Sequence, residues 1–324
     1  MRLGRWTIGG VVHEGLLIDD AAVPFTDGRT VADALALGRD RLDRIAGWAD
    51  GSPAAPLAEV HLLVPLIAAS VRDFVTFEEH VEGISASVDG ASHVAPEWYE
   101  APTFYFTNPH TLLGDHATVR PPVSSRMDFE LEVAAILGGA TGSDGRDLTP
   151  AQAARHVFGY TIMNDWSARD VQSREMQVRL GPCKGKDFGT SLGPWIVTAD
   201  ELDPHADAEG FLELEVEAYV NGTRVGHDLL SHMGWPFAEL VAYASRDSIV
   251  VPGDVLGSGT AGNGGCLAEL WGRSGDLWPA PLSAGDDVVL RVEGIGALHG
   301  TVGASQPAAA IPPARSHDRV RTRA

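Results

Sequence analysis

The chain has 324 residues, of which 44% are hydrophobic and 21% charged, so it can bury a substantial core in one large domain or in a small and a larger one. No run approaches the roughly 18 apolar residues of a membrane span, and a formal net charge of −20 disfavours nucleic acid as a partner, because phosphates select basic faces. Cys183 and Cys266 form no CxxC motif, and no secretory signal is apparent at the N-terminus. We therefore expect a soluble protein of the reducing cytoplasm without a membrane partner.

The first 65 residues alternate between short strand patterns and a helical pattern. Strands are predicted over 5–8 and 14–18, and a helix over 30–48. A turn-rich linker over 50–56 precedes an apolar strand over 60–64. These patterns predict a small N-terminal α+β domain that ends near residue 65.

Residues 71–83 mix apolar and ionisable side chains. Phe74 and Phe77 interleave with Asp73 and His80. On a helix, Asp73 and His80 are seven positions apart, which is two turns, and so share a face. A single histidine in such a pattern is more often a surface or core residue, so this pair alone identifies no site.

An acidic alternation marks the segment 126–137, which follows a predicted strand over 103–107. Asp128, Glu130 and Glu132 point to one face of the expected strand, and apolar residues point to the other. The end of the segment is continuously apolar, so the strand runs into a core. Carboxylates stacked inside a core need a cation, and a divalent ion with oxygen ligands meets that need. A solvated acidic strand face is the alternative.

The run 163–194 concentrates charge, amide groups and glycine. If Asp165 caps a helix, Arg169 lies one turn along on the same face and Gln172 a further turn along. Lys186 follows in a glycine-punctuated loop before a strand over 195–198. A carboxylate, a guanidinium and an amide would then line one side of a cleft. A solvated helix with a salt bridge is the alternative.

A second acidic alternation occupies 211–221 and ends in the hairpin signal Asn221-Gly222. Nothing near it in sequence would complete a site, so its glutamates are interpreted as facing solvent: Glu213, Glu215 and Glu217. An amphipathic helix is predicted over 233–243. A strand, a Pro-Gly turn and another strand are predicted over 249–256.

The segment 257–265 contains five glycines, which let backbone amides approach a ligand closely. It lacks the lysine of a P-loop and the context of a dinucleotide motif, so a nucleotide site is not expected. Glu269 follows in a predicted strand over 267–271, and the last clear strand is predicted over 286–292. Residues 305–324, rich in proline, alanine and arginine without periodicity, predict a disordered tail.

Several motifs, in order between residues 71 and 302, together resemble the fumarylacetoacetate hydrolase superfamily: Asp73 with His80, DFELE, NDWSARDVQ, GKDFGTSLGPW, PGD and GSGT. The resemblance implies a mainly β or α+β fold, with a mixed β-roll catalytic domain over 66–304. It also implies a homodimer, a small anionic oxo acid as substrate, and a divalent ion, Mg²⁺ first, with Mn²⁺ or Ca²⁺ as alternatives.

The same resemblance implies roles for individual residues. The metal ligands would be Asp73, Glu130, Glu132 and Asp165. The catalytic residues would be His80 as general base, Glu269 as the acid that orients it, and Lys186 as a charge-stabilising or proton-donating group. Substrate contacts would come from Arg169, Gln172 and Thr260.

The implied reaction is hydrolysis of a carbon–carbon bond in an acylpyruvate or 1,3-diketo acid, through a metal-bound enolate and an activated water. Val75 and Met176 stand where fumarylacetoacetases have tyrosines, and the loop from Gln172 to Lys186 is one residue longer, so the acyl group stays open. Metal-dependent decarboxylation, isomerisation or hydration of an oxo acid is the first alternative. A non-catalytic binding protein of the same fold is a more distant one.

Overall fold

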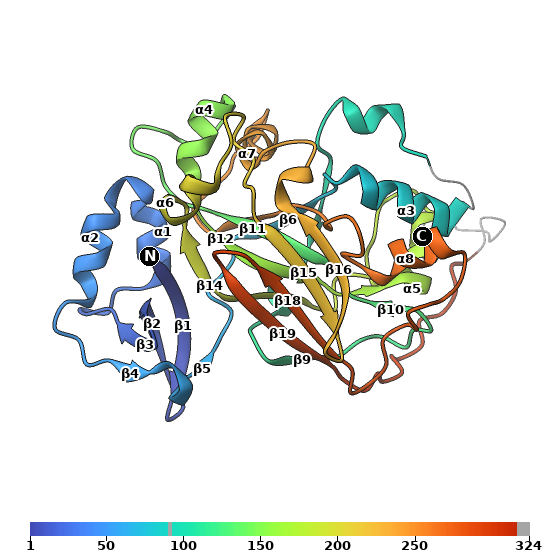
Figure 1. Cartoon of the computed structure of the whole chain (residues 1–324), viewed down its shortest axis with the longest axis horizontal. Helices are drawn as coiled ribbons and strands as arrows, with labels where there is room; N and C mark the ends of the chain where they lie inside the picture. Colours follow the sequence, from blue (N-terminus) through green and yellow to red (C-terminus); the bar gives the residue numbers. More distant parts are fainter. Residues whose placement is uncertain (90–92, 316–324) are drawn as a thin grey trace, which may run out of the picture.

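The computed structural model describes residues 1–89 and 93–315 (Figure 1). Twelve strands of this part form the largest sheet, in the order β4-β3-β2-β1-β14-β12-β11-β17-β6-β7, with β5 beside β1 and β8 beside β14. These strands are β1 (Arg2–Ile8), β2 (Val11–Ile18), β3 (Ala21–Pro24), β4 (Ala55–Pro56), β5 (His61–Leu62), β6 (Ser70–Phe74), β7 (Phe104–Thr107), β8 (Leu112–Leu113), β11 (Leu131–Leu137), β12 (Val157–Asp165), β14 (Thr190–Thr198) and β17 (Asp254–Gly257).

Strands β11 and β12 lie at the centre of this sheet. Every residue of both strands is buried, and the two strands pair antiparallel along their length. A fully buried strand needs cover on both faces. One hydrophobic cluster contains Val133 and Ala135, and another contains Ala134 and Ile136. Carboxylates on β11 and β12 are therefore surrounded by protein.

A second sheet, in the order β16-β15-β18-β19-β9, packs against the first. Val216 and Leu290 of the second sheet join the hydrophobic cluster that contains Val133 of β11. Asn221 and Gly222 turn the β15–β16 hairpin with φ of +49° and +77°, which confirms the hairpin predicted from this pair. The strands of this second sheet are β9 (Ala117–Val119), β15 (Glu215–Val220), β16 (Thr223–Leu229), β18 (Asp287–Val292) and β19 (Gly296–Val302). Strand β10 (Met127–Asp128) pairs separately with β13 (Ser167–Ala168).

Short helices surround the two sheets (Figure 1). They are α1 (Val31–Leu37), α2 (Leu42–Ala46), α3 (Glu78–Asp89), α4 (Pro150–Ala153), α5 (Arg169–Met176), α6 (Ala199–Leu202), α7 (Phe237–Ser245) and α8 (Leu267–Ser274). The 3-10 helices are η1 (Arg39–Arg41), η2 (Gly47–Ala49), η3 (Leu57–Glu59), η4 (Pro96–Tyr99), η5 (Pro109–Thr111), η6 (Ala154–His156), η7 (Asp203–His205) and η8 (Leu230–His232). This sheet-rich α+β architecture confirms the predicted fold class.

The predicted helix over 30–48 is wrong as one element, because α1 ends at Leu37. Gly38 has a φ of +83°, and a Cβ at this position would lie 1.8 Å from the carbonyl oxygen of Gly139. Close backbone contact and a left-handed conformation both require glycine there. The chain then continues through η1, α2 and η2 rather than in one helix.

The N-terminal strands extend the large sheet (Figure 1, blue). Strand β1 pairs antiparallel with β14 through Arg2 and Leu3. The strand predicted over 60–64 is reduced to β5, which pairs with β1. The domain boundary near residue 65 stays a prediction.

Two predictions about C-terminal strands are wrong in part. Of the strand, turn and strand expected over 249–256, only β17 is regular, and it pairs parallel with β6. Strand β19 follows the predicted last strand and pairs with β18; Gly296 and Gly300 weaken its sequence signal. Residues 305–315 form neither helix nor strand, and the rest of the predicted tail, 316–324, lies outside the described residues.

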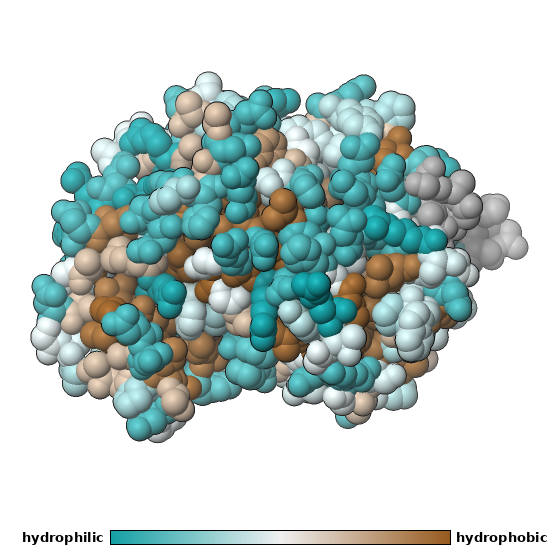
Figure 2. All heavy atoms as spheres, in the orientation of Figure 1, coloured by the Kyte–Doolittle hydropathy of each residue, from teal (hydrophilic) through white to brown (hydrophobic). Residues whose placement is uncertain are grey.

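Hydrophilic side chains cover much of the face shown in Figure 2, with smaller apolar patches between them. Within residues 1–89 and 93–315, no helix has the length and apolar character needed to cross a lipid bilayer.

Candidate active site

A cleft of about 350 Å³ brings together side chains from segments far apart in the sequence. Strands β6 and β7, helices α3 and α5, and the loops before β11, β14 and α8 all contribute to it. Seven of the predicted site residues line this cleft: Asp73, His80, Glu130, Arg169, Gln172, Lys186 and Thr260. The remaining three, Glu132, Asp165 and Glu269, are buried beside it.

Asp73 lies on strand β6, so the helix expected to place it on one face with His80 is wrong. Its neighbours in the sheet are Gly257 of β17 and Tyr105 of β7. A Cβ on Gly257 would lie 2.7 Å from Glu132 Oε2 and 2.8 Å from Asp73 Oδ1. The glycine therefore leaves room for two carboxylates to approach each other. His80 reaches the same cleft from the separate helix α3.

Three carboxylates form the centre of the site. One oxygen each from Asp73, Glu130 and Glu132 lies within 4.8 Å of the others, and all three side chains are buried. Asp128, placed with them in the sequence prediction, is not in this group. Its carboxylate accepts hydrogen bonds from the backbone N–H groups of Leu267 and Ala268 at the start of α8. The strand is irregular between β10 and β11, so the simple alternation does not hold there.

These carboxylates fit a divalent ion. Asp73 Oδ1 and both oxygens of Glu132 are buried without a hydrogen-bond partner among the described residues. Burial raises the pKa of Asp73 and that of Glu132 well above their usual ranges, and neighbouring carboxylates add to the effect. An unpaired buried carboxylate is costly, and without a cation this pair must hold a proton. A set of carboxylate oxygens is also the ligand chemistry that Mg²⁺, Mn²⁺ and Ca²⁺ prefer.

Asp165 is the last residue of β12, so it does not cap a helix as predicted. Its Oδ2 accepts hydrogen bonds from the Tyr105 hydroxyl and from Lys186 Nζ, the latter at 2.7 Å. Thr190 Oγ1 donates to Oδ1 at 3.3 Å. Asp165 therefore lies beside the carboxylate group and is held by side chains. Its predicted role as a fourth metal ligand stays a prediction.

Two cations are buried against these acids. Lys186, 3% exposed, forms ion pairs with Glu130 and Asp165. Burial lowers its pKa, but these two carboxylates raise it more, so the ammonium stays charged. Burial alone would raise the pKa of Glu130, yet Lys186 and Arg169 outweigh it and hold that pKa at about 2.

Three side chains hold the Arg169 guanidinium in place. Its Nε donates to Asp128 at 2.8 Å, and its Nη1 lies 2.8 Å from Glu130 and 3.2 Å from Gln172 Oε1. Its Nη2 is buried without a hydrogen-bond partner in the described part of the chain. An unsatisfied guanidinium N–H in a cleft is a ready donor to an anionic oxygen.

His80 is buried, and burial lowers the pKa of its imidazole to about 3. The ring is therefore neutral near pH 7. Its Nδ1 lies 3.7 Å from the Sγ of Cys266. Cys266 is also the N-cap of α8.

Glu269 lies in helix α8, so the predicted strand over 267–271 is wrong. Its side chain forms an ion pair with Arg273 at 2.7 Å and accepts hydrogen bonds from the backbone N–H groups of Gly264, at 3.3 Å, and Asn263. No hydrogen bond to His80 is among the described contacts. Glu269 packs against Gly83, where a Cβ would lie 2.4 Å from Glu269 Cγ. Gly83 is one helical turn from His80, so Glu269 is adjacent to the helix that carries the histidine. Burial raises the pKa of Glu269 to about 7.

Sequence reasoning missed two residues of the site. Tyr105, in the predicted strand over 103–107, is the sheet neighbour of Asp73 and donates to Asp165. In a strand, Tyr105 points to the face opposite that of Phe104 and Phe106. This alternation does not identify the partners of Tyr105, which depend on strand pairing. Cys266 follows the glycine-rich segment directly. Val75 and Met176, the two positions noted as departures, do line the cleft.

The family model described as fumarylacetoacetate (FAA) hydrolase C-terminal matches residues 69–303. The fumarylacetoacetase of Arabidopsis thaliana is 29% identical over an alignment that covers 66% of this chain and 61% of that protein. The chain thus spans about three fifths of the length of this relative.

Two solved structures share the fold. The 5-carboxymethyl-2-hydroxymuconate delta-isomerase of Mycobacterium smegmatis is 25% identical, with a TM-score of 0.67, and the match covers 94% of this chain and 100% of that one. The maleylpyruvate hydrolase of Sphingobium sp. SYK-6, in complex with manganese(II) ion and pyruvate, is 21% identical with the same TM-score and coverage, which shows the fold alone. Because the family model matches most of the chain, the protein belongs to the fumarylacetoacetate hydrolase family.

Proposed function

We propose that this protein is a metal-dependent hydrolase that cleaves a carbon–carbon bond of an acylpyruvate or another 1,3-diketo acid. The observation that carries the proposal is the grouping of Asp73, Glu130 and Glu132 beside a cleft that also holds two buried cations and a neutral histidine. Asp73 and Glu132 contribute oxygens that have no hydrogen-bond partner among the described residues. This reaction needs three groups: a metal site, a hydrogen-bond donor to the anionic substrate, and a base.

Mg²⁺ is the proposed cofactor, with Mn²⁺ and Ca²⁺ as alternatives. Asp73, Glu130 and Glu132 would hold it, with Asp165 as the fourth carboxylate. When bound, the ion would polarise the oxygens of the keto acid and stabilise the negative charge that develops on them. The manganese and pyruvate complex of the Sphingobium hydrolase supports both the metal and the class of substrate.

Arg169 and Lys186 would bind the anionic substrate. The free Nη2 of Arg169 would donate to a substrate oxygen, while Gln172 and Asp128 hold the guanidinium in place. The four predicted ligand carboxylates outnumber Arg169 and Lys186 by two. A divalent cation would therefore bring this group near neutrality before the anion enters.

His80 would accept a proton from water, and the resulting hydroxide would attack the acyl carbonyl carbon. The electron pair of the broken bond passes to the keto-acid fragment, and Lys186 supplies the proton that this fragment takes up. The products are a carboxylic acid and the keto acid. Glu269, next to α3, is proposed to orient His80.

The wall of the cleft indicates what kind of acyl group fits. Val75, Ile84, Phe104 and Met176 line it together with the polar residues. Val75 and Met176 are apolar and stand at the two positions where fumarylacetoacetases have tyrosines. We therefore propose an aliphatic or otherwise apolar acyl group rather than the fumaryl group.

The proposal is tested with chelator-treated protein to which Mg²⁺ or Mn²⁺ is returned. Acylpyruvates of increasing acyl length, 1,3-diketo acids and oxaloacetate are offered, and loss of enol absorbance is followed with product analysis. We expect metal-dependent release of a carboxylic acid and pyruvate from an acylpyruvate. Cleavage of none of these compounds by the metal-loaded protein would overturn the proposal.

A metal-dependent isomerase or decarboxylase is the second candidate, supported by the M. smegmatis isomerase among the similar structures. These reactions need no attacking water, so they depend less on His80. Decarboxylation or isomerisation retained by the His80→Ala variant would favour this candidate. A non-catalytic binding protein is the third, and it would be favoured if Mg²⁺ and Mn²⁺ did not bind at all.

We also propose a cytoplasmic homodimer. The resemblance to the family supports the dimer, and the two free cysteines, one of them exposed, support a reducing compartment. Sedimentation equilibrium of the full chain tests the dimer, because a monomer at all concentrations would contradict it.

A further inference from the structure

A second group of potential metal ligands lies outside the candidate active site. Asp115 and His116 follow β8, and His299 lies on β19. One ligand atom from each of the three residues lies within 4.8 Å of the others. We propose that Asp115, His116 and His299 bind a divalent transition-metal ion, with Zn²⁺ as the expected occupant.

The backbone holds this group together. His299 N donates to Asp115 Oδ1 at 2.7 Å, and His116 N donates to the His299 carbonyl oxygen at 2.9 Å. The Asp115 side chain is buried, and its Oδ1 also lies 3.1 Å from His299 Nδ1. The Asp115 carboxylate and the His299 ring are therefore positioned by the fold and not by side-chain contacts alone.

The imidazole rings of His116 and His299 are stacked. Their ring centroids are 4.3 Å apart and their planes differ by 6°. His116 Nε2 lies 3.6 Å from Asp115 Oδ2, and the His116 side chain is 68% exposed, so it can rotate toward an ion. His116 also has a φ of +59°, a left-handed conformation that costs a non-glycine residue roughly 1 kcal/mol.

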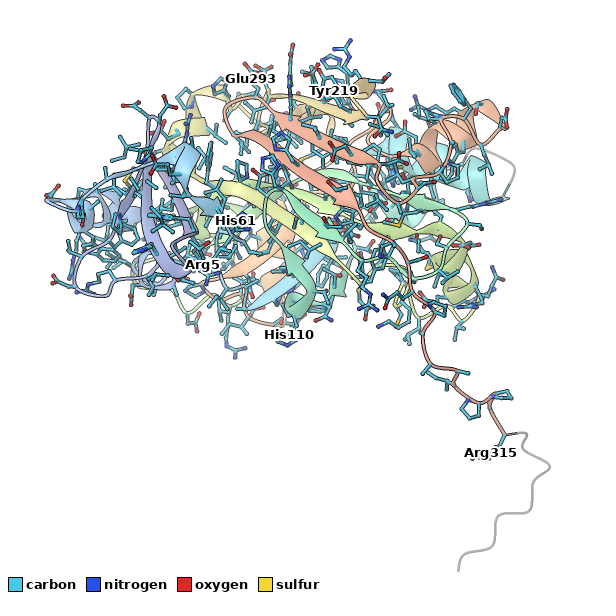
Figure 3. The ribbon with its side chains drawn as sticks, turned by 90° about the horizontal axis from the view of Figure 1, so that it is seen from below. Arg5, His61, His110, Tyr219, Glu293 and Arg315 are labelled. Carbon is cyan, nitrogen blue, oxygen red and sulfur yellow. The ribbon has the colours of Figure 1, made fainter. Side chains whose placement is uncertain are left out.

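An ion has access to this group. The three residues line an open cleft of about 780 Å³ between the N-terminal segment and strands β14 and β19. His61 of β5 lines the same cleft, and Figure 3 shows it between the N-terminal strands and the rest of the molecule. An ion bound here would lie at the junction of two parts of the chain that are distant in sequence.

The ligand set selects a different metal from the one expected at the active site. Two imidazoles and one carboxylate, with positions left for water, match Zn²⁺ and neighbouring transition metals. The oxygen-only group of Asp73, Glu130 and Glu132 matches Mg²⁺ or Mn²⁺. The two sites are therefore separable by metal and by mutation.

Zn²⁺ titration of the full chain by calorimetry, with millimolar Mg²⁺ present throughout, tests the proposal. We expect the variants His116→Asn and His299→Gln each to weaken one Zn²⁺ site by about tenfold or more. Asparagine is chosen because it tolerates the left-handed conformation at position 116. His110→Asn, an exposed histidine on η5 that is not in this cluster, is the matched control and should change nothing.

The same titration on Glu132→Gln separates this site from the active site. We expect the site that depends on His116 and His299 to keep its affinity in Glu132→Gln. Equal Zn²⁺ affinity and stoichiometry in the wild type, His116→Asn and His299→Gln would overturn the proposal. Loss of the same binding event in His110→Asn would overturn it too, since binding would then be non-specific. Circular dichroism confirms that each variant is folded.

Discussion

Strands β11 and β15 carry similar alternations of glutamate and apolar residues, yet their glutamates have opposite surroundings. Glu132 of β11 is buried, and neither of its oxygens has a hydrogen-bond partner in the described part of the chain. Glu215 of β15 is exposed, and Glu217 accepts hydrogen bonds from Tyr219 and Arg224 at the surface. Both strands lie next to the same hydrophobic cluster.

The difference comes from what covers each strand. Strand β11 lies between β12 and β17 and is covered on both faces. Asp73 and Lys186 approach Glu132 and the preceding Glu130 from distant segments. Strand β15 has one covered face, and its glutamates point away from it. An alternating acidic pattern therefore indicates a site only when segments remote in sequence enclose it.

The largest expected effect comes from neutralising a glutamate of β11. Glu132→Gln keeps the shape of the side chain but removes a charged ligand, so turnover should fall by about a thousandfold or more. The matched change on β15, Glu217→Gln, removes a surface ion pair and should alter turnover by less than about twofold. Steady-state kinetics on the best substrate of the screen measures both. Similar losses in the two variants would show that the comparison is wrong.

His80→Ala is expected to lower turnover by about a hundredfold or more. Metal affinity should be unchanged, because His80 is not among the predicted ligands. Activity assays together with Mn²⁺ titration separate these quantities, and His110→Ala serves as the control. If metal binding were lost with activity, His80 would be supporting the metal group and not acting as a base.

Acid should destabilise the wild type more than a variant that lacks the His80 imidazole. The pKa of His80 is about 3 in the folded chain, so between that value and the ordinary value of about 6.5 the unfolded state binds the extra proton. Stability is thus retained above pH 6.5 and lost as pH falls toward 3. At pH 5 this difference in proton binding lowers the free energy of unfolding by about 2 kcal/mol relative to its value well above pH 6.5.

Urea unfolding of metal-free wild type and His80→Gln between pH 7 and pH 4.5 measures this. The free energies of unfolding should converge or cross as pH falls, because the carboxylates are common to both proteins. Parallel pH curves would contradict a buried, neutral His80.

The smallest expected effect concerns the wall of the cleft and not its charged centre. Val75→Tyr should lower kcat/KM for an acylpyruvate with a long aliphatic chain by about tenfold and should affect acetylpyruvate less. The ratio of the two kcat/KM values is the measurement. An equal change for both substrates would indicate that Val75 does not contact the acyl group.

Much of the site was predictable from the sequence because its residue types are unusual where they occur. Glu130 and Glu132 run into a continuous apolar segment, and Asp165, Arg169 and Lys186 crowd one stretch. Their actual partners depend on strand pairing, which a local pattern does not contain. Tyr105 was missed for this reason, since its neighbours come from β6 and β12.

Errors in secondary structure had local causes. Asp73 and His80 were assigned to one helix because their spacing fits helical geometry, but pairing of β6 with β17 and β7 makes the first part a strand. The segment predicted as a strand over 267–271 is helix α8, which Cys266 caps. Tertiary pairing of strands decides the first case, and a local helix cap decides the second. The resemblance to the family, and not the local pattern, associates Asp73, His80 and Glu269 with one site.

Mn²⁺ binding, followed by electron paramagnetic resonance, tests the central claim most directly. The wild type is predicted to bind a Mn²⁺ ion that Glu132→Gln does not retain and that Glu217→Gln binds with unchanged affinity. Mn²⁺ binding that is equal in the wild type and Glu132→Gln would contradict the claim that the buried carboxylates of β11 and β6 form a metal site.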